Sequence, residues 1–418
     1  MAVVLRSTSD LVYLPDHGFV GEEGALRILA KVNRQIRRLD VSHNLLGSEG
    51  TLVLMQGLNS LRHQYSTSDL GLWGLTEINL GHNGITDSVV DVILGYAKKD
   101  VMMRKVQLQG NRIELRENLD SILYCLNASQ LESLSLTDNR RLLDKSIIRL
   151  FDSLSTPHLN ELHLSICNLG PEISPSIISY LTSPRSRYLE LLGLNGNRLG
   201  LEAVRNLINT LERGNFTILN LGLFASSSAS DAAHHEEEDG VEAVQPREKR
   251  REERQLGQET ARIPRLLERN RLLTQRVEAA ALRCLPCARI LLNAKSPSDI
   301  DTAQRAIESI SLKTHTPYFR LLDLPPEVIY LIVRHTSGDA AALSDAQFTR
   351  LRKDAEGNEG LARAIRRRRS KAEAWKVDRT GLGMAEMQLR DDWLYWGKWD
   401  RWECDVLAQP GPAVDSEE

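Results

Sequence analysis

Short blocks in the first half of the chain alternate apolar and polar residues and then end in an asparagine. The block LDVSHN, from Leu39, places two apolar residues two apart before Asn44. Successive side chains of a β-strand point to opposite faces, so this alternation predicts a short strand with one buried face. Apolar residues at helical spacing follow the blocks, as in SVVDVILGYA from Ser88 and LEAVRNLINTL from Leu201. The pattern therefore predicts strands and helices in alternation.

The strand block recurs at a nearly constant interval. Successive copies are 39, 28, 28, 28, 30 and 27 residues apart, because they begin at Ile36, Leu75, Met103, Leu131, Leu159, Leu189 and Phe216. This regularity indicates a solenoid with a unit of about 28 residues. VGEEGALRIL, from Val20, is similar to LGSEGTLVLM, from Leu46, and predicts a further, degenerate unit at the N-terminal end.

Asparagines stand at equivalent positions after the strands: Asn44, Asn83, Asn111, Asn139 and Asn197. An amide side chain both donates and accepts, so we expect each asparagine to bond the backbone where the chain leaves its strand. Cys167 takes this position in the fifth unit. Phe224 takes it in the seventh, where we expect the solenoid to end.

The blocks resemble leucine-rich repeats of the ribonuclease-inhibitor type over residues 11–225. The resemblance implies an α/β solenoid with a parallel sheet on its concave side, helices on its convex side and a protein partner bound across the sheet. We expect equivalent inward positions to be buried at Leu80, Leu108, Leu136 and Leu164.

Residues between the inward leucines are expected to face the concave side. We interpret the following as partner-binding residues: Arg38, Asp40, His43, Glu77, Asn79, His82, Lys105, Gln107, Gln109, Ser135, Asp138, Glu161, His163 and Asn195, together with Ser133 and Thr137. The same register assigns Leu191, Ile218 and Leu223 to this face and predicts an apolar C-terminal end. The alternative is that the polar residues only keep the sheet soluble.

Composition limits the class of protein. A chain of 418 residues is long enough for two or more folded units, and a net charge of −3 argues against a dedicated nucleic-acid binder. Five cysteines without framework spacing favour a reducing compartment. MAVVLRSTSD lacks the apolar core of a signal peptide, and no apolar run is long enough to span a membrane. We expect a monomeric cytoplasmic protein that has no cofactor.

The second half of the chain has a different organisation. Residues 226–260 are small, polar and charged, which predicts a disordered insert. Residues 261–295 have a helical pattern and are expected to cap the solenoid, and residues 296–418 are expected to be a further helical region. Two basic runs, REKRREER from Arg247 and RRRRSK from Arg366, leave nuclear import open.

The sequence LPPEVI resembles the opening of an F-box, a helical module that docks ubiquitin-ligase substrate receptors onto a Skp-type adaptor. The resemblance implies adaptor-binding roles for Leu324, Pro325, Glu327 and Ile329. The following GDAAALSDAQFTRLRKDA departs from an F-box, because it lacks the apolar residues of the later helices. Ser344 and Gln347 are instead expected to form a capping box for a separate helix. The alternative to an F-box is therefore that the LPPEVI segment forms an ordinary helix that packs locally.

Three further features have structural explanations. Cys284 and Cys287 form a single C-x-x-C in an apolar helical stretch, which favours buried cysteines over a metal or redox pair. His234 and His235 lie in the polar insert, and we assign no metal to them. Trp393, Trp396, Trp399 and Trp402 are three residues apart and would share one face of a helix, which we expect to pack within the chain; the alternative is that this face anchors an interface with a partner.

No catalytic motif stands out in the sequence, so we interpret the protein as a scaffold or adaptor that binds a protein partner, rather than an enzyme. One alternative is a substrate receptor of a cullin-RING ubiquitin ligase, through the F-box-like helix. A second is a regulator of a small GTPase of the Ran type, whose activating proteins share this repeat class. The acidic run from Glu236 to Asp239 is short and internal, which ranks that alternative lower.

Overall fold

The computed structural model describes residues 10–66, 73–224, 246–292, 324–357 and 393–394. The chain divides into two compact units, Met1–Glu268 and Arg269–Glu418.

The first unit is built on one parallel sheet of eight strands that follow one another in chain order. The strands are β1 (Leu11–Tyr13), β2 (Arg38–Asp40), β3 (Glu77–Asn79), β4 (Lys105–Gln107), β5 (Ser133–Ser135), β6 (Glu161–His163), β7 (Leu191–Gly193) and β8 (Asn220–Gly222). Each strand pairs in parallel with the next strand of the sequence, which confirms an α/β leucine-rich-repeat solenoid. β1 supplies the degenerate N-terminal unit.

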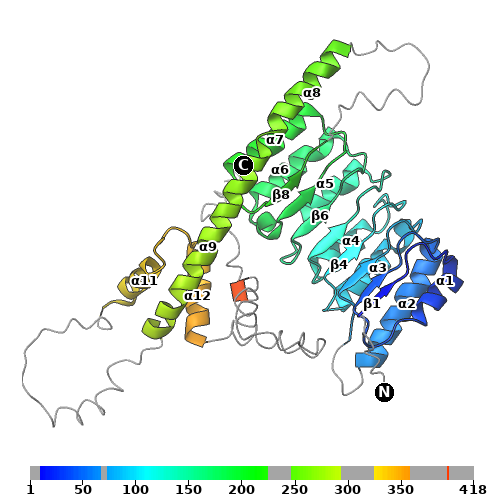
Figure 1. Cartoon of the computed structure of the whole chain (residues 1–418), viewed down its shortest axis with the longest axis horizontal. Coiled ribbons are helices and arrows are strands. Elements are labelled where there is room, and N and C mark those ends of the chain that lie inside the picture. Colours follow the sequence, from blue (N-terminus) through cyan, green and yellow to red (C-terminus); the bar gives the residue numbers. More distant parts are fainter. Residues whose placement is uncertain (1–9, 67–72, 225–245, 293–323, 358–392, 395–418) are drawn as a thin grey trace, which may run out of the picture. The chain divides into compact units, whose positions relative to one another are not determined.

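Helices connect successive strands and lie along one side of the sheet (Figure 1). They are α1 (Gly21–Leu29), α2 (Gly47–Ser66), η1 (Asp87–Val89), α3 (Val90–Lys99), α4 (Leu119–Asn127), α5 (Asp144–Ser153), η2 (Pro171–Ile173), α6 (Ser174–Thr182), η3 (Pro184–Tyr188) and α7 (Gly200–Arg213). A parallel connection requires a crossover, and a helix supplies it while burying its apolar face on the sheet. The core of the unit therefore lies between the sheet and this layer of helices.

The predicted inward positions are buried. Leu80, Leu108 and Leu164 have no exposed surface, and Leu136 is 3% exposed. Each occupies the same place after its strand, so the leucines of neighbouring units stack into one continuous core. The predicted register of these units is confirmed.

The asparagines form a hydrogen-bonded ladder along the edge where the strands end. Asn111 is typical: its Nδ2 donates to the carbonyl oxygens of Leu80 (3.1 Å) and Leu108 (2.9 Å). Its Oδ1 accepts from the backbone N–H groups of Asn83 (3.0 Å) and Ile85 (3.1 Å). One side chain thus satisfies buried backbone groups in its own unit and in the preceding one.

Cys167 occupies the ladder position in the fifth unit. Its thiol donates to the carbonyl oxygens of Leu136 (3.2 Å) and Ser165 (3.3 Å), which are the roles that an amide group fills elsewhere. Burial raises the pKa of this thiol to about 12, so it stays protonated and remains a donor. A thiol is only a weak acceptor, so the ladder is weakest at this point.

The register predicted for the last unit is wrong by two residues. Leu221 pairs with Leu192, so the unit begins at Ile218, 29 residues after Leu189, rather than at Phe216. In FTILNLGLF, apolar residues fit the strand pattern whether the unit begins at Phe216 or at Ile218. The alternation of apolar and polar residues alone therefore did not distinguish the two registers. Phe224 therefore does not hold the asparagine position.

A helical cap covers the C-terminal end of the solenoid. It consists of α8 (Pro246–Thr260) and the first residues of α9 (Ile263–Leu292). The apolar side chains that pack on the solenoid core are Leu256, Ile263, Leu266 and Leu267. The cap was predicted to start at residue 261, and it starts earlier.

Ion pairs also attach the cap to α7. Glu259 bonds Arg205 (2.9 Å) and Arg262 (2.6 Å), and Arg262 bonds Glu212. The prediction of disorder through residue 260 is wrong for residues 246–260. This stretch is poor in apolar residues but rich in arginine, glutamate and glutamine, which favour helices. Residues 226–245 of the predicted insert lie outside the described residues.

The second unit contains the remainder of α9, α11 (Pro326–His335) and α12 (Asp345–Gly357). Its core is small and rich in alanine, with the members Val277, Ala280, Ala281, Cys284, Ala288, Val333, Ala342, Leu343, Phe348, Leu351, Ala355, Trp393 and Leu394. The predicted capping box is confirmed. The backbone N–H of Gln347 donates to Ser344 Oγ (3.0 Å), and that of Ser344 donates to Gln347 Oε1 (3.1 Å).

Candidate interaction surface

The first and third residues of each strand lie on the concave face, and the middle residue is buried. We call the first positions the first row: Leu11, Arg38, Glu77, Lys105, Ser133, Glu161, Leu191 and Asn220. The third positions form the second row: Tyr13, Asp40, Asn79, Gln107, Ser135, His163, Gly193 and Gly222. The register therefore brings most of the predicted partner-binding residues together in two neighbouring rows.

The other predicted residues lie just beyond the second row, where the chain leaves the strands. Gln109, Thr137 and Asn195 are two positions further along their units. His43, His82 and Asp138 directly precede the ladder asparagines and have positive φ angles of 54°, 54° and 57°. These six residues thus form a border along one edge of the concave face.

Two histidines of this border stack on each other. The rings of His43 and His82 are 4.1 Å apart and nearly parallel. A glycine is required at position 110 for the His82 ring to adopt this position, because a Cβ atom at Gly110 would lie 2.1 Å from the ring. Gly110 also has a φ of 67°, which a glycine adopts without strain.

Amide and carboxylate side chains of the concave face bond one another across the strands. Asn79 Nδ2 donates to Asp40 Oδ2 (3.1 Å), and Gln109 Nε2 donates to Asn79 Oδ1 (3.0 Å). Asp40 also accepts from Ser42 Oγ (2.7 Å). These bonds hold the side chains of three consecutive units in a fixed arrangement.

Charged residues of the first row are paired in the same lateral way. Lys105 Nζ lies 3.7 Å from Glu77, and Arg38 lies 2.9 Å from Asp10. Glu161 accepts from Ser133 Oγ at 2.8 Å. Ser133 is buried, but the charged groups remain half-exposed, so they can still contact a bound molecule while their orientation is fixed by their neighbours.

The C-terminal end of this face differs from the prediction. Ile218 and Leu223 are fully buried, because the register of the last unit turns them inward. Leu191 does lie in the first row and is half-exposed. Gly193 and Gly222 occupy the second row, so bare backbone replaces the predicted apolar side chains there.

Tyr13 was missed by the sequence analysis. It lies in the second row beside Asp40 and is 64% exposed. The alternation of buried Val12 and Leu14 around it is a signal that could have assigned it to the concave face.

The predicted adaptor-binding residues lie on different sides of α11. Pro325 and Glu327 are exposed, whereas Ile329 packs against the core of the second unit. The exposed apolar residues of α11 are Val328 and Leu331, which are three apart and share one face, whereas Leu324 precedes the helix and is half-buried.

Cys284 is buried within the core of the second unit, where its thiol bonds the carbonyl oxygen of Val333 at 3.4 Å. Burial raises the pKa of this thiol, which opposes redox chemistry and metal binding. Trp393 packs in the same core.

Several other predicted features lie outside the described residues, namely His234, His235, the acidic run 236–239, the basic run from Arg366, Trp396, Trp399 and Trp402. Within the described part of the chain, no three metal-binding side chains converge. Among the same residues, no helix has the length and apolar content needed to cross a bilayer.

Comparison with known proteins agrees with the architecture. A family model described as Leucine Rich repeat matches residues 75–88, a segment that contains β3 and the ladder asparagine Asn83. No curated protein matches the chain. Leucine-rich repeats are generally protein-interaction modules, and the eight parallel strands place this chain in the same structural class.

Proposed function

We propose that the protein is a scaffold or adaptor that binds a protein partner across the two rows of the concave face. The observation that carries this proposal is the lateral bonding of polar side chains in consecutive units. Side chains that are already held in place lose little conformational entropy when a partner binds.

The chemistry of these rows favours a polar partner. Acidic Asp40 and Glu77 are followed by basic Lys105 and then by acidic Glu161. Such alternating charge selects a partner with the complementary pattern, and it contributes more to specificity than to affinity. Tyr13, at one end of the face, adds an exposed aromatic ring of the kind that often anchors an interface.

A charge swap tests the proposal without breaking the sheet. The double variant Glu77→Lys, Lys105→Glu keeps an ion pair between β3 and β4 but reverses the charges that a partner meets. We expect the fold to persist and the partners recovered by proximity labelling to be lost.

A swap on the convex helices is the matched control. Asp120→Arg with Arg149→Asp exchanges an exposed ion pair between α4 and α5 and should leave partner recovery unchanged. Retention of every partner by the concave swap would refute the proposal, provided that both variants unfold at the same temperature as the wild type.

A second candidate function is adaptor binding through α11. It is supported by Val328 and Leu331, two exposed apolar residues on one face of α11, which lie close in sequence to the exposed residues Pro325 and Glu327. A helix of this kind can dock into an apolar groove of a Skp-type adaptor, and the protein would then act as a substrate receptor of a ubiquitin ligase.

The burial of α11 residues decides which substitutions test adaptor binding without disturbing the fold. Replacing Ile329 would disturb the core of the second unit, whereas Val328→Asp with Leu331→Asp changes only outward residues. We expect this variant to lose co-purification of the adaptor and a cullin, and His335→Ala, an exposed polar change in the same helix, to retain it. Absence of the adaptor from the wild-type sample would refute this function.

A further inference from the structure

The longest spacing between strand blocks corresponds to an unusually long helix. α2 has 20 residues, whereas α3 in the next unit has 10. The additional turns of α2 lie beside the end of α3 and form an open hollow of about 650 Å³. Its lining is polar and basic: Asn59, Ser60, Arg62, His63, Gln64 and Lys99. Insertions in one unit of a solenoid often mark a binding site.

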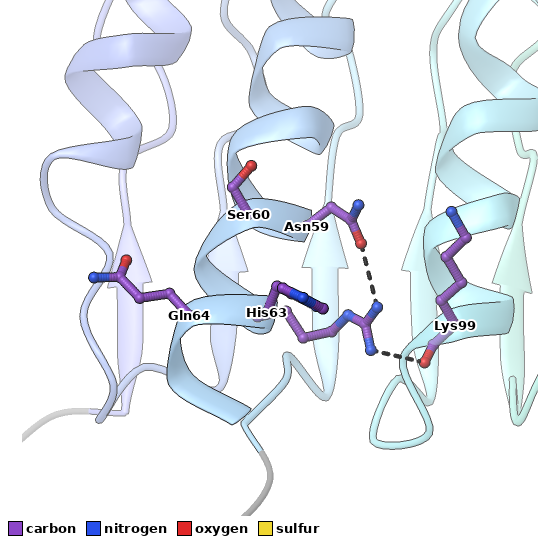
Figure 2. A pocket seen from close by; sticks show the side chains of 6 residues that line it. Asn59, Ser60, His63, Gln64 and Lys99 are labelled. Atoms are coloured by element: carbon purple, nitrogen blue, oxygen red, sulfur yellow. Dashed lines mark hydrogen bonds between the residues drawn. The ribbon is translucent and has the colours of Figure 1, made fainter. Parts of the chain in front are cut away.

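Arg62 is fixed at the centre of this lining. Its Nη1 donates to the carbonyl oxygen of Lys99 (3.1 Å), and its Nη2 donates to Asn59 Oδ1 (3.3 Å). Its Nε is buried and has no hydrogen-bond partner in the described part of the chain. Figure 2 shows Asn59 and His63 on α2 facing the end of α3, where Lys99 lies.

The acidic group in electrostatic contact with Arg62 is already engaged. The Asp100 carboxylate accepts from the backbone N–H groups of Leu75 (2.9 Å) and Met102 (3.0 Å) and from the Tyr96 hydroxyl (3.0 Å). Asp100 is also buried, whereas His63 and Lys99 are exposed. The solvent side of the hollow therefore carries positive charge.

We propose that this hollow binds the phosphate group of a phosphorylated side chain in a protein partner. A guanidinium group, an ammonium group, an imidazole and the Ser60 hydroxyl line this hollow and supply several hydrogen-bond donors to it. Phosphate presents three acceptor oxygens and a charge between −1.5 and −2, which suits a set of donors from two helices. The site lies among the helices, away from the concave rows, and the proposal does not depend on what those rows bind.

A protein ligand fits this surface better than a nucleic acid does. A polynucleotide requires cations along a continuous track. On the next helices of the solenoid, however, the cation Arg149 is paired with the anion Asp120. The net charge of the chain is −3, which gives no overall attraction to a nucleic acid.

The test measures binding of a degenerate peptide library with a central phosphoserine to the full-length protein, by fluorescence anisotropy. The unphosphorylated library is the reference, and inorganic phosphate is the competitor. Lys99→Glu is the test variant, because its side chain is exposed and its backbone carbonyl, which holds Arg62, stays in place. Lys145→Glu makes the same charge change at an exposed position of α5 and is the matched control.

We expect the wild type to prefer the phosphorylated library and inorganic phosphate to displace it. Lys99→Glu should weaken binding roughly ten-fold or more, since a charge-assisted contact is replaced by repulsion. Lys145→Glu should bind like the wild type, and thermal melts should show that both variants are folded.

Three results would overturn the proposal. The first is equal binding of the phosphorylated and unphosphorylated libraries by the wild type. The second is undiminished binding by Lys99→Glu. The third is single-stranded DNA binding that exceeds phosphopeptide binding and is lost in Lys99→Glu, which would assign the hollow to nucleic acid.

Discussion

The two units of the chain bury different kinds of side chain. The solenoid core consists largely of leucine and isoleucine between a sheet and helices, whereas the smaller core of the second unit has five alanines among its thirteen buried residues. A buried leucine removes more apolar surface from water than a buried alanine, so each residue of the solenoid contributes more hydrophobic stabilisation. The second unit must depend more on its polar contacts.

Arg334 illustrates how the second unit uses polar contacts. It extends from α11 and bonds the carbonyl oxygen of Ala340 (2.7 Å), the carbonyl oxygen of Leu343 and the Asp345 carboxylate (2.6 Å). Arg276 on α9 bonds Asp339 at 2.6 Å. In the solenoid, the corresponding task of joining elements falls to a repeated asparagine. The solenoid thus repeats one type of hydrogen-bonding residue in successive units, whereas the second unit uses different arginine contacts at different positions.

The largest expected effect comes from shortening a leucine of the solenoid core. Leu136→Ala should reduce the free energy of unfolding by ~2–5 kcal/mol, because it leaves a cavity in a fully packed interior. The loss should spread to β4 and β6, since each unit is stabilised by its neighbours. Hydrogen exchange should show faster exchange in these strands and unchanged exchange in α12. An unchanged melting temperature would contradict the register, and Lys145→Ala is the surface control.

The capping box offers a contrasting, local perturbation of the second unit. Ser344→Ala should cost about 1 kcal/mol, because the backbone N–H of Gln347 loses its acceptor. Exchange should accelerate at the start of α12 and remain unchanged in β4 to β6. Thr349→Ala, at an exposed position of the same helix, should have less effect. Equal loss of hydrogen-exchange protection in both units would mean that the two units unfold together, which would contradict their separate stabilisation.

The Cys167 position allows the ladder to be strengthened. Cys167→Asn should stabilise the solenoid by about 1 kcal/mol, because it brings an amide oxygen to a position where sulfur is a weak acceptor. The reciprocal variant Asn139→Cys should destabilise the fold by a similar amount. Chemical denaturation measures the change in the free energy of unfolding for each variant, which should be opposite in sign. Destabilisation by Cys167→Asn would show that the space at residue 167 fits sulfur better than an amide.

The smallest expected effect concerns the cap and pH. Hydrogen bonds from Arg205 and Arg262 hold the pKa of Glu259 below its ordinary value of 4.5. The folded pKa is therefore below the unfolded one, so these contacts stabilise the cap above about pH 4.5 and weaken as the pH falls through the folded pKa. Hydrogen exchange of α8 should be slower in the wild type than in a Glu259→Gln variant above this range. The difference between the two proteins, measured at each pH, should decline as the pH falls. A difference that does not change with pH would exclude this role.

Sequence reasoning succeeded where a pattern repeats or is local. Six consecutive units have leucines and an asparagine or cysteine at fixed positions, so only one register fits all of them. The Ser344–Gln347 capping box was equally predictable, because its partners are three residues apart. In the last unit, Ile218, Leu219 and Leu221 allowed two registers, and only pairing with β7 chooses between them.

Features that depend on distant parts of the chain were not predictable in the same way. Arg62 meets Lys99 from 37 residues away, and the spacing of 39 residues gave no indication of a longer helix. In α8, low apolar content suggested disorder, whereas the ion pair between Glu259 and Arg205, 54 residues apart, attaches the helix to α7. Composition does not reveal such pairs.

The chain of bonds from Gln109 through Asn79 to Asp40 has a consequence for how the concave face can change. Replacing Asn79 would release both neighbours at once, since its amide donates to one and accepts from the other. Substitutions at these three positions should therefore be non-additive, as is usual for residues in one hydrogen-bond network. The three units present a single coupled surface, on which evolution would alter residues in groups rather than one at a time.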